Sequence, residues 1–433
     1  MKISIIGTGY VGLTTGISMA ELGNRVVLVD VITEKLILIE EGRSPFYEPD
    51  VDELLRKHVE SGRITTSMDT RASVLSSDIT FITVGTPSKE DGSMDDRYIM
   101  AACRDIGEAL STHPRYHVVV VKSTVVPGTT AGPVKTTLEK SSGRRAGADF
   151  GIAMCPEFLR EGAAMHDSMK PDRIVIGCED IRTYDVLYSL FRPLSSPILK
   201  TDPTSAEMIK YASNSLLATK ISFANEISRI CEKVGVDVYG VMKGVGMDFR
   251  ISPHFLRAGA GFGGSCFPKD VSALIQIARS LGVDTPILES VMMNNMIQPI
   301  HLVDVAEKVM GSFQGKRIAV LGLAFKPDTD DVRSTRSEPL IRELLKRGAI
   351  VSAHDPKAAE NFRREIPEIE YFIDANAAVD WAEGVFIMTE WPEYRKIDWN
   401  SKTHLEGVFD GRRSVDPASM KNLIYWSIGN PLP

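Results

Sequence analysis

The 433-residue sequence has no apolar run long enough to span a membrane, and Met1-Lys2 leads directly into a short strand rather than a signal peptide. It also lacks an excess of positive charge, because the formal net charge is −7 at pH 7. That balance argues against a general nucleic-acid or membrane surface, although it leaves room for a local basic pocket. These absences predict a cytoplasmic protein with no nucleic-acid partner and no membrane partner.

Cysteine is scarce, and the five cysteines include no Cys-x-x-Cys pair: Cys103, Cys155, Cys178, Cys231 and Cys266. An odd number without paired spacing favours reduced thiols over a disulfide framework. The histidines do not cluster with cysteines at the spacing of metal ligands. His113 and His117 are four residues apart, but Pro114 and the strand that follows exclude a helical metal pair. We therefore predict no metal site.

Hydrophobic residues make up 43% of the chain and charged residues 25%, as in soluble globular proteins, and the length indicates two or three domains. Short strands alternate with amphipathic helices up to Pro203. There the pattern changes to one long helix, with Thr204-Ser-Ala-Glu207 as a capping box and periodicity through about Val234. A new α/β unit begins at Lys316. The predicted fold class is α/β: two Rossmann-like, doubly wound domains joined by a long central helix.

The first α/β unit carries a dinucleotide-binding pattern. The strand Lys2–Ile6 is followed by Gly7-Thr-Gly-Tyr-Val-Gly12, a helix, and a second strand that ends in Asp30. Gly7 permits the tight turn, Gly9 lets a pyrophosphate approach the backbone, and Gly12 lets the helix pack on the strand. Asp30 would accept hydrogen bonds from a ribose and repel a 2′-phosphate, so NAD is favoured over NADP. The alternative is an ordinary strand-to-helix turn with no ligand.

Other polar residues follow strand ends, where ligands of open parallel sheets lie. Thr86 follows the strand at 78–84 and Thr124 the strand at 117–121, so both are candidate ligand contacts, unless their hydroxyls merely cap the next segment. Glu157 and Glu161 follow the strand at 150–154 and would share a face if the segment were helical. Their place favours a site role over the usual explanation, solvated surface acids.

A single cysteine lies in the glycine-rich stretch Gly259-Ala-Gly-Phe-Gly-Gly-Ser-Cys-Phe-Pro-Lys-Asp270. Helical periodicity follows it, so Cys266 is expected at a helix N-terminus beside Lys269, two features that favour a thiolate. We interpret Cys266 as a reactive nucleophile rather than a buried structural cysteine. In the long helix, Lys210 and Asn214 are one turn apart and project together, although a solvated face would also explain Lys210.

The last α/β unit has only Gly322 in its first turn and lacks the dinucleotide pattern. A nucleotide without a nicotinamide could bind there. Phe325, Lys326 and Arg333 lie in the turn region, where aromatic and cationic contacts to such a ligand are expected.

Segments spread over nearly the whole chain resemble the UDP-glucose/GDP-mannose dehydrogenase family: GTGYVGL, EEGRSPFYEP, VGTPS, KSTVVPGTT, CPEFLREG, GFGGSCFPKD, GLAFKPDTDDVR and FDGR. The cysteine motif is specific to this family, whereas the first fingerprint is not. Within the family, the segments PEFLREG and SCFPKD are most similar to those of the UDP-glucose 6-dehydrogenases.

The resemblance implies roles for three sets of residues. NAD would be held by Gly7, Gly9, Tyr10, Val11, Gly12, Asp30, Lys35, Thr86, Thr124, Glu161 and Arg333. The catalytic set would be Cys266, Lys210, Asp270, Asn214, Glu157 and Thr124. The substrate would contact Glu157, Phe158, Leu159, Lys210, Asn214, Arg250, Phe262, Gly263, Phe325, Lys326 and Arg412, with Arg250 reaching the substrate of a neighbouring subunit.

The resemblance also implies domains and an activity. Residues 1–202 would form an NAD-binding Rossmann domain, 203–300 a central helical dimerisation domain with the cysteine loop, and 301–433 a UDP-binding Rossmann-like domain of a homodimer. The activity would be four-electron oxidation of UDP-glucose to UDP-glucuronate through a Cys266 thiohemiacetal and thioester. The alternatives are the same chemistry on GDP-mannose or a UDP-N-acetylhexosamine, a two-electron dehydrogenase, and a non-enzymatic NAD-binding regulator.

The sequence departs from the family pattern at two places. Cys155 stands where relatives often have asparagine, so a second thiol is expected near the site. Ser334-Thr-Arg336 replaces the usual Arg-Glu-Ser continuation, which makes Arg336 a rival to Arg333 as the nucleotide contact.

Overall fold

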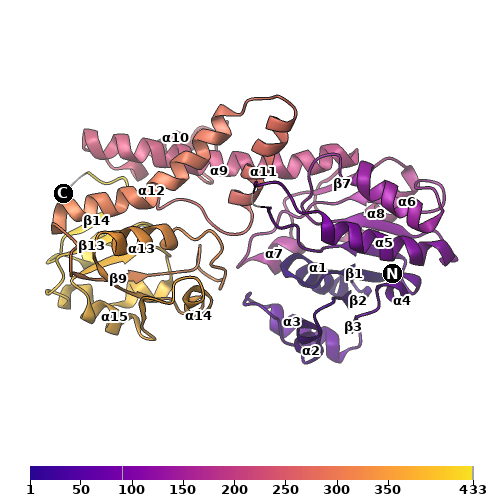
Figure 1. Cartoon of the computed structure of the whole chain (residues 1–433), viewed down its shortest axis with the longest axis horizontal. Helices are drawn as coiled ribbons and strands as arrows, with labels where there is room; N and C mark the ends of the chain where they lie inside the picture. Colours follow the sequence, from indigo (N-terminus) through magenta and orange to yellow (C-terminus); the bar gives the residue numbers. More distant parts are fainter. Residues whose placement is uncertain (90, 432–433) are drawn as a thin grey trace. The chain divides into compact units, whose positions relative to one another are not determined.

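The computed structural model describes residues 1–89 and 91–431, which divide into two compact units, Met1–Ala212 and Ser213–Pro433. Each unit contains one sheet with flanking helices (Figure 1). Helix α9 (Pro203–Val234) runs through the boundary as one continuous element of 32 residues. The expected fold class, two doubly wound sheets and a long central helix, is confirmed.

The N-terminal unit is built on an eight-stranded sheet with the order β3-β2-β1-β4-β5-β6-β7-β8. Its strands are β1 Lys2–Ile6, β2 Arg25–Val29, β3 Ile64–Ser67, β4 Ile79–Ile82, β5 Val118–Val121, β6 Gly151–Met154, β7 Ile174–Cys178 and β8 Ile198–Thr201. Its helices are α1 Tyr10–Glu21, α2 Thr33–Glu40, α3 Val51–Glu60, α4 Thr70–Leu75, α5 Arg97–Thr112, α6 Lys135–Ser142, α7 Ala164–Met169 and α8 Ile181–Phe191. All strand pairs are parallel except β6 with β7.

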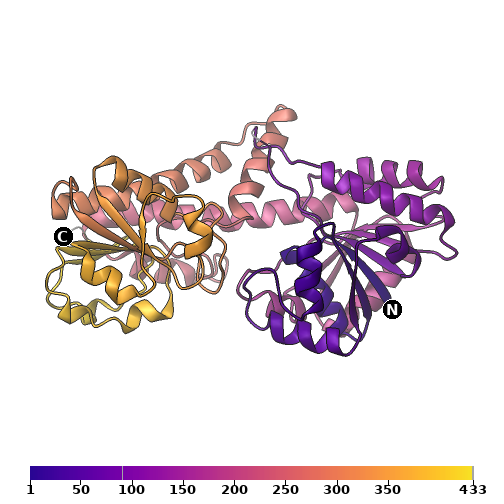
Figure 2. The same ribbon diagram turned by 60° about the horizontal axis from the view of Figure 1, so that its bottom comes forward.

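Alternate residues of these strands face two different cores. Along β5, Val118 and Val120 belong to one hydrophobic cluster, whereas Val119 and Val121 belong to another. Helix α1 contributes to the first cluster through Leu13, and α5 contributes to the second. Figure 2 shows helices on both sides of the twisted strands. Burial on both faces explains why the central strands are continuous apolar runs rather than alternating ones.

The start of α9 differs from the expected capping box. Asp202 precedes Pro203 and accepts hydrogen bonds from the Ser205 backbone N–H at 2.8 Å and its hydroxyl at 2.6 Å. An acid before a first-turn proline is a strong capping arrangement, so the box prediction was wrong. Glu207 is fully buried instead, and its carboxylate accepts N–H bonds from Gly128 at 2.6 Å and Thr130 at 2.8 Å.

The C-terminal unit has a six-stranded, all-parallel sheet with the order β11-β10-β9-β12-β13-β14. Its strands are β9 Arg317–Leu321, β10 Ile350–His354, β11 Glu370–Tyr371, β12 Gly384–Ile387, β13 Gly407–Asp410 and β14 Tyr425–Ser427. Its helices beyond α9 are α10 Val238–Gly246, α11 Phe267–Ser280, α12 Pro286–Met310, α13 Ser337–Lys346, α14 Ala359–Arg363 and α15 Ala375–Trp381. The strand order reverses between β9 and β12, which is where such sheets bind ligands.

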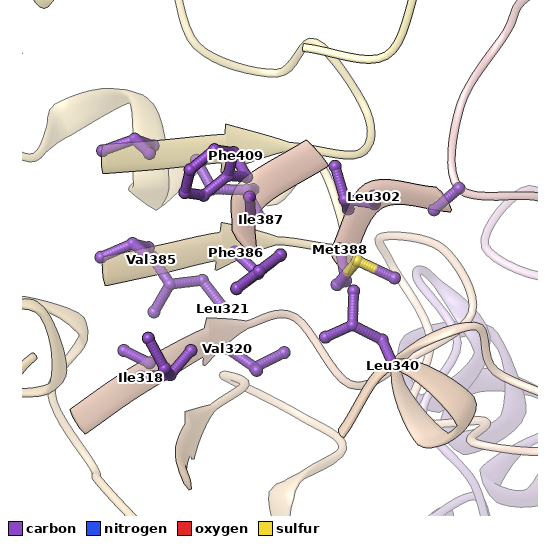
Figure 3. Close-up of a cluster of buried hydrophobic side chains, with 14 of the residues drawn as sticks. Leu302, Ile318, Val320, Leu321, Leu340, Val385, Phe386, Ile387, Met388 and Phe409 are labelled. Atoms are coloured by element: carbon purple, nitrogen blue, oxygen red, sulfur yellow. The ribbon is translucent and has the colours of Figure 1, made fainter. Parts of the chain in front are cut away.

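The core of this unit forms around the middle strands. Leu321 of β9, Phe386 of β12 and Phe409 of β13 are fully buried, and Leu302 of α12 and Leu340 of α13 pack in the same cluster (Figure 3). This packing fixes the carboxyl ends of β9, β12 and β13, from which several of the candidate site residues extend.

Candidate active site

The glycines of the turn between β1 and α1 differ in what surrounds them. A Cβ on Gly12 would lie 1.9 Å from the Gly7 carbonyl oxygen, and one on Gly7, where φ is +98°, would lie 2.9 Å from Val84. A Cβ on Gly9 would meet nothing within 4 Å. Packing inside the protein therefore requires glycine at two positions but not at Gly9. Open space at the N-terminus of α1 fits close approach of an anionic ligand.

Asp30 lies beside this turn at the end of β2. Its Oδ2 accepts hydrogen bonds from the Thr8 N–H at 2.8 Å and hydroxyl at 2.7 Å, and its Oδ1 accepts from the Ile32 N–H at 3.0 Å. Burial on its own would raise the pKa of Asp30, but these hydrogen bonds, with Lys35 4.0 Å away, outweigh it and lower the pKa. The carboxylate is thus held ionised next to the glycine turn, where it can accept from a diol and repel a phosphate.

Tyr10 connects the same turn to a distant segment through Glu48, a residue that the sequence analysis did not single out. The Tyr10 hydroxyl donates to Glu48, whose carboxylate also accepts N–H bonds from Gly162 at 2.6 Å and Ala164 at 2.8 Å. Burial and Glu48 raise the pKa of Tyr10 well above its usual range. Glu48 therefore holds the start of α1 against the segment that follows Glu161.

The turns after β4 and β5 are joined directly. The Thr86 hydroxyl donates to the Thr124 carbonyl at 2.9 Å, so Thr86 bonds to the neighbouring turn rather than capping its own segment. Both threonines and Val11 are half-buried at the carboxyl ends of the strands, together with the glycine turn. The two candidates therefore lie at the edge of the sheet expected for a ligand.

The segment after β6 is irregular rather than helical, so the condition under which Glu157 and Glu161 would share a helical face is not met; Pro156, two residues after the end of β6, lacks the N–H that a continuing ladder or helix would use. Both carboxylates are nonetheless buried, with exposures of 7% and 9%, which excludes solvated surface acids. Lys210 is buried too, and its Nζ donates to the Glu157 carbonyl at 2.8 Å and to Oε1 at 2.7 Å. A solvated face does not explain Lys210.

Further groups surround this ion pair. The Leu159 N–H donates to Glu157 Oε2 at 2.8 Å, and the guanidinium of Arg173 lies 3.8 Å from the centre of the Phe158 ring. Lys122, which the sequence analysis did not select, stands in the same cluster, where burial lowers its pKa despite the opposing effect of Cys155. Burial raises the pKa of Cys155 to about 12. Cys155 is therefore a neutral thiol near pH 7 and a poor nucleophile.

In the C-terminal unit, two asparagines hold the glycine-rich stretch before Cys266. Asn225 of α9 accepts the Gly259 N–H at 2.8 Å, and Asn295 of α12 both accepts from the Phe262 N–H at 2.7 Å and donates to its carbonyl at 2.9 Å. The Phe262 ring is buried in a small core cluster, so its backbone rather than its ring borders the loop. Both asparagines are buried and were missed because their partners lie more than 30 residues away.

Cys266 occupies the N-cap position of α11, as expected, and is half-buried. Asp270, one turn later, is 1% exposed; its Oδ2 accepts from the Asn214 amide at 2.6 Å and its Oδ1 from Lys269 Nζ at 2.6 Å. The Lys269 ammonium therefore pairs with the Asp270 carboxylate. Lys210 and Asn214 project from the same face of α9, one turn apart.

The candidate nucleotide contacts of this unit gather at the strand-order reversal. The Phe325 ring packs against Gly264, and Lys326 Nζ lies 5.6 Å from its centre. Arg412, just after β13, donates to the carbonyls of Gly261 and Met388, both at 2.9 Å. These residues come from three separate segments, and Gly263 closes against Phe325 as well.

The remaining arginines are placed differently. Arg336 lies beside Gly261, and burial together with the Arg412 charge lowers the pKa of Arg336 to about 10. Arg333 is 63% exposed and pairs with Asp331. Arg250 is 75% exposed, pairs with Asp248, and is not gathered with the other candidates of its unit.

Across residues 1–89 and 91–431, no helix is long and apolar enough to cross a bilayer. Among the same described residues, no three histidine, cysteine, aspartate or glutamate side chains group as metal ligands would. His113 and His117 do lie side by side with tilted rings, 4.9 Å between ring centres, but His117 bonds Thr80 at 2.8 Å and His113 bonds the Arg115 carbonyl at 2.8 Å.

Comparison with known proteins gives matches along the whole chain. Residues 1–195, 204–296 and 319–417 match the NAD binding, central and UDP binding domains of the UDP-glucose/GDP-mannose dehydrogenase family. The chain is 44% identical to the UDP-glucose 6-dehydrogenase TuaD of Bacillus subtilis, over 99% of this chain and 93% of that protein. The expected resemblance and the NAD cofactor are thereby confirmed.

Two solved structures extend the comparison. A UDP-glucose dehydrogenase from Pyrobaculum islandicum superposes with a TM-score of 0.93 at 42% identity, covering 99% of this chain and 98% of that one. A UDP-D-ManNAc dehydrogenase from Pyrococcus horikoshii gives a TM-score of 0.87 at 27% identity, covering 99% of both chains.

Proposed function

This chain belongs to the UDP-glucose/GDP-mannose dehydrogenase family, and from that membership we propose that it oxidises UDP-glucose to UDP-glucuronate with two molecules of NAD. UDP-glucose is chosen as the substrate because the chain is 44% identical to a UDP-glucose 6-dehydrogenase but only 27% identical to the UDP-D-ManNAc dehydrogenase. The proposal includes the division into an NAD-binding domain 1–202, a dimerisation domain 203–300 and a UDP-binding domain 301–433, and a cytoplasmic location.

NAD fits the first turn of the N-terminal unit. The space over Gly9 suits the pyrophosphate, and ionised Asp30 suits the ribose diol, with Tyr10, Val11, Lys35, Thr86 and Thr124 around the same sheet edge. NAD, when bound, accepts one hydride in each of the two oxidations. Because Asp30 would repel the 2′-phosphate of NADP, we assign the preference for NAD over NADP to this residue.

The nucleotide of the substrate fits the C-terminal unit. Lys326 and Arg412 supply positive charge, and Phe325 an aromatic face, beyond the ends of β9 and β13. Parallel sheets bind ligands at such a strand-order reversal. We assign Arg336 to this site as well, because a second guanidinium beside Arg412 favours an anion between them.

Oxidation of the C6 alcohol to the aldehyde releases a hydride and a proton. Lys210 donates to the Glu157 carboxylate, so as an ammonium it suits stabilisation of the alkoxide rather than acceptance of the proton. Asp270 is then the better proton acceptor, through a water, because its two oxygens keep lone pairs beyond those used by Asn214 and Lys269.

The aldehyde must gain a nucleophile before it can lose a second hydride. Addition of the Cys266 thiolate forms a C–S bond and, with one proton, a thiohemiacetal; loss of hydride and proton leaves a thioester. Water then cleaves the C–S bond, releases the carboxylate and returns the thiol. Glu157 would assist the water, and Asn214 and Lys210 would stabilise the oxyanion.

The decisive experiment uses Cys266→Ala. Wild-type protein should yield two NADH per uronate released. The variant, given the UDP-sugar 6-aldehyde and NADH, should still make the alcohol, whereas with the same aldehyde and NAD it should make almost no acid. Steady conversion of UDP-glucose to acid with two NADH per uronate by Cys266→Ala would exclude the thioester. Cys155→Ala is the matched control and should keep full stoichiometry, because Cys155 is a buried neutral thiol.

Substrate choice is tested separately, with a panel of UDP-glucose, GDP-mannose and UDP-N-acetylhexosamines. The highest kcat/KM should belong to UDP-glucose. A preference for another sugar nucleotide would move the assignment within the family, and one NADH per product would instead indicate a two-electron dehydrogenase. A chain that binds NAD without turning over any of these would be a regulator.

A further inference from the structure

A basic pocket lies in the C-terminal unit, with a volume of about 510 Å³; it is lined by Tyr239, Arg257, Arg395, Arg413 and Asp416 among others. We call it the arginine pocket. Three guanidiniums converge there although the chain as a whole carries a net charge of −7. None of these residues belongs to the NAD, catalytic or UDP sets described above.

The three arginines differ in their partners. Arg413 is committed to the protein, because it bonds both oxygens of Asp237, at 2.6 and 3.0 Å, and lies 4.3 Å over the Tyr239 ring. Arg257 donates to the Arg412 carbonyl at 2.8 Å, and Arg395 to the Ser414 carbonyl at 2.9 Å. Over the described part of the chain, neither of these two forms a salt bridge with a carboxylate.

Two guanidiniums therefore keep their charge and most of their N–H donors available. Each guanidinium has five such donors in a planar fork that matches the oxygens of a phosphate. The acid of the lining, Asp416, is exposed and accepts the Ala418 N–H at 3.0 Å. The charge of the pocket thus favours an anion.

Hydrogen bonds from buried groups fix the backbone that forms the walls of the arginine pocket. Asp410, fully buried at the end of β13, accepts N–H bonds from Ser414 at 2.7 Å and Val415 at 3.1 Å through Oδ2, and from Arg412 at 2.8 Å through Oδ1. On the opposite wall, the Tyr239 hydroxyl donates to the Ala258 carbonyl at 2.9 Å. A fixed backbone lowers the ordering cost of binding a small ligand.

From this geometry we propose that the arginine pocket is a binding site for a phosphate-bearing small molecule, distinct from the NAD and UDP sites. Arg257 and Arg395 supply the charge-assisted hydrogen bonds to the phosphate, and Arg413, paired with Asp237, supports the wall between them. A phosphate ester and free inorganic phosphate share this chemistry.

The test is a calorimetric titration of the full chain at constant ionic strength, first with inorganic phosphate and then with a hexose monophosphate. UDP is present at saturation so that phosphate cannot enter the proposed UDP site. We expect saturable binding that weakens about tenfold in Arg395→Gln and in Arg257→Gln, the loss typical of a charged hydrogen bond. Arg364→Gln, which removes an exposed arginine elsewhere in the unit, should bind like wild type.

Stronger binding of the hexose phosphate identifies an ester as the ligand class, and equal binding identifies phosphate itself. Absence of saturable binding, or binding unchanged in both Arg395→Gln and Arg257→Gln, would overturn the proposal. If the chain fails to bind UDP, the proposed substrate is wrong, but the same comparison without UDP still tests the pocket. Circular dichroism shows whether each variant is folded. If only one of the two variants folds, its phosphate affinity alone is enough to test the proposal.

Discussion

Single glycine positions in the first turn separate folding from ligand binding. A methyl group on Gly12 would lie 1.9 Å from a carbonyl oxygen, whereas one on Gly9 would enter open space. We expect Gly12→Ala to lose about 3 kcal/mol of stability or fail to fold, and Gly9→Ala to keep its melting temperature while binding NAD at least tenfold more weakly. Thermal unfolding and NAD titration of the two variants check this. Wild-type NAD affinity in Gly9→Ala would contradict the assignment.

For individual residues, the sequence predicted the candidate site residues more successfully than it predicted their hydrogen-bond partners. Glu157 and Lys210 were selected from strand-end position and helix spacing, yet their mutual hydrogen bond joins residues 53 positions apart. Glu48 and Asn295 were not selected, because a buried acid or amide is recognisable only from its distant partners, and one sequence carries no record of those.

Secondary-structure elements were predictable where local and tertiary preferences agree. The strands β1 and β2 were expected at the observed residues, because runs of β-branched residues end at a glycine or an acid. The start of α9 was not predicted correctly. Both Asp202 and Glu207 could take part in an N-terminal cap, but Glu207 instead accepts hydrogen bonds from the distant backbone N–H groups of Gly128 and Thr130, and Asp202 caps the helix. The second sheet was predicted from its pattern alone, although its turn lacks the glycine fingerprint.

Buried polar side chains also join β1, β4 and the residue that precedes β5. Ser4 bonds Thr80 at 2.7 Å, and Thr80 bonds His117 Nε2 at 2.8 Å. Burial, with a smaller effect from His113, lowers the pKa of His117 from 6.5 to about 3. Below pH 6.5, His117 becomes protonated in the unfolded chain, whereas in the folded chain it stays neutral down to about pH 3. The free energy of unfolding therefore holds its full value above pH 6.5 and decreases as the pH falls from 6.5 toward 3.

For this single group the loss at pH 5 is about 2 kcal/mol. Hydrogen exchange of β5 amides at pH 7 and pH 5 measures it locally, which avoids assuming that both units unfold together. His117→Asn should be less stable at pH 7 but lose less on acidification, whereas the exposed control His404→Asn should behave like wild type. An unaltered pH dependence in His117→Asn would show that another group is responsible.

At the scale of the whole molecule, helix α9 carries an exposed apolar stripe. Leu216, Phe223 and Ile230 repeat every seven residues along α9, with exposures of 63%, 49% and 52%. Such a stripe on a long helix is typical of association between helices, and a second copy of the chain is the occupant that the proposed dimerisation domain requires. In the proposed dimer, the exposed Arg250 would reach the substrate of the neighbouring subunit.

We therefore expect Phe223→Lys to convert a dimer into a monomer, because a charge at the centre of an apolar interface must be desolvated without a partner. Light scattering after size exclusion gives the mass, and activity should fall with dissociation if Arg250 acts across the interface. Ile373→Lys, which introduces the same charge at a fully exposed isoleucine away from α9, should leave the dimer and the activity unchanged.

Mixing inactive Arg250→Ala with inactive Cys266→Ala subunits should restore part of the activity, since a mixed dimer holds one complete site. A wild-type chain that is monomeric at micromolar concentration and fully active would exclude a shared site.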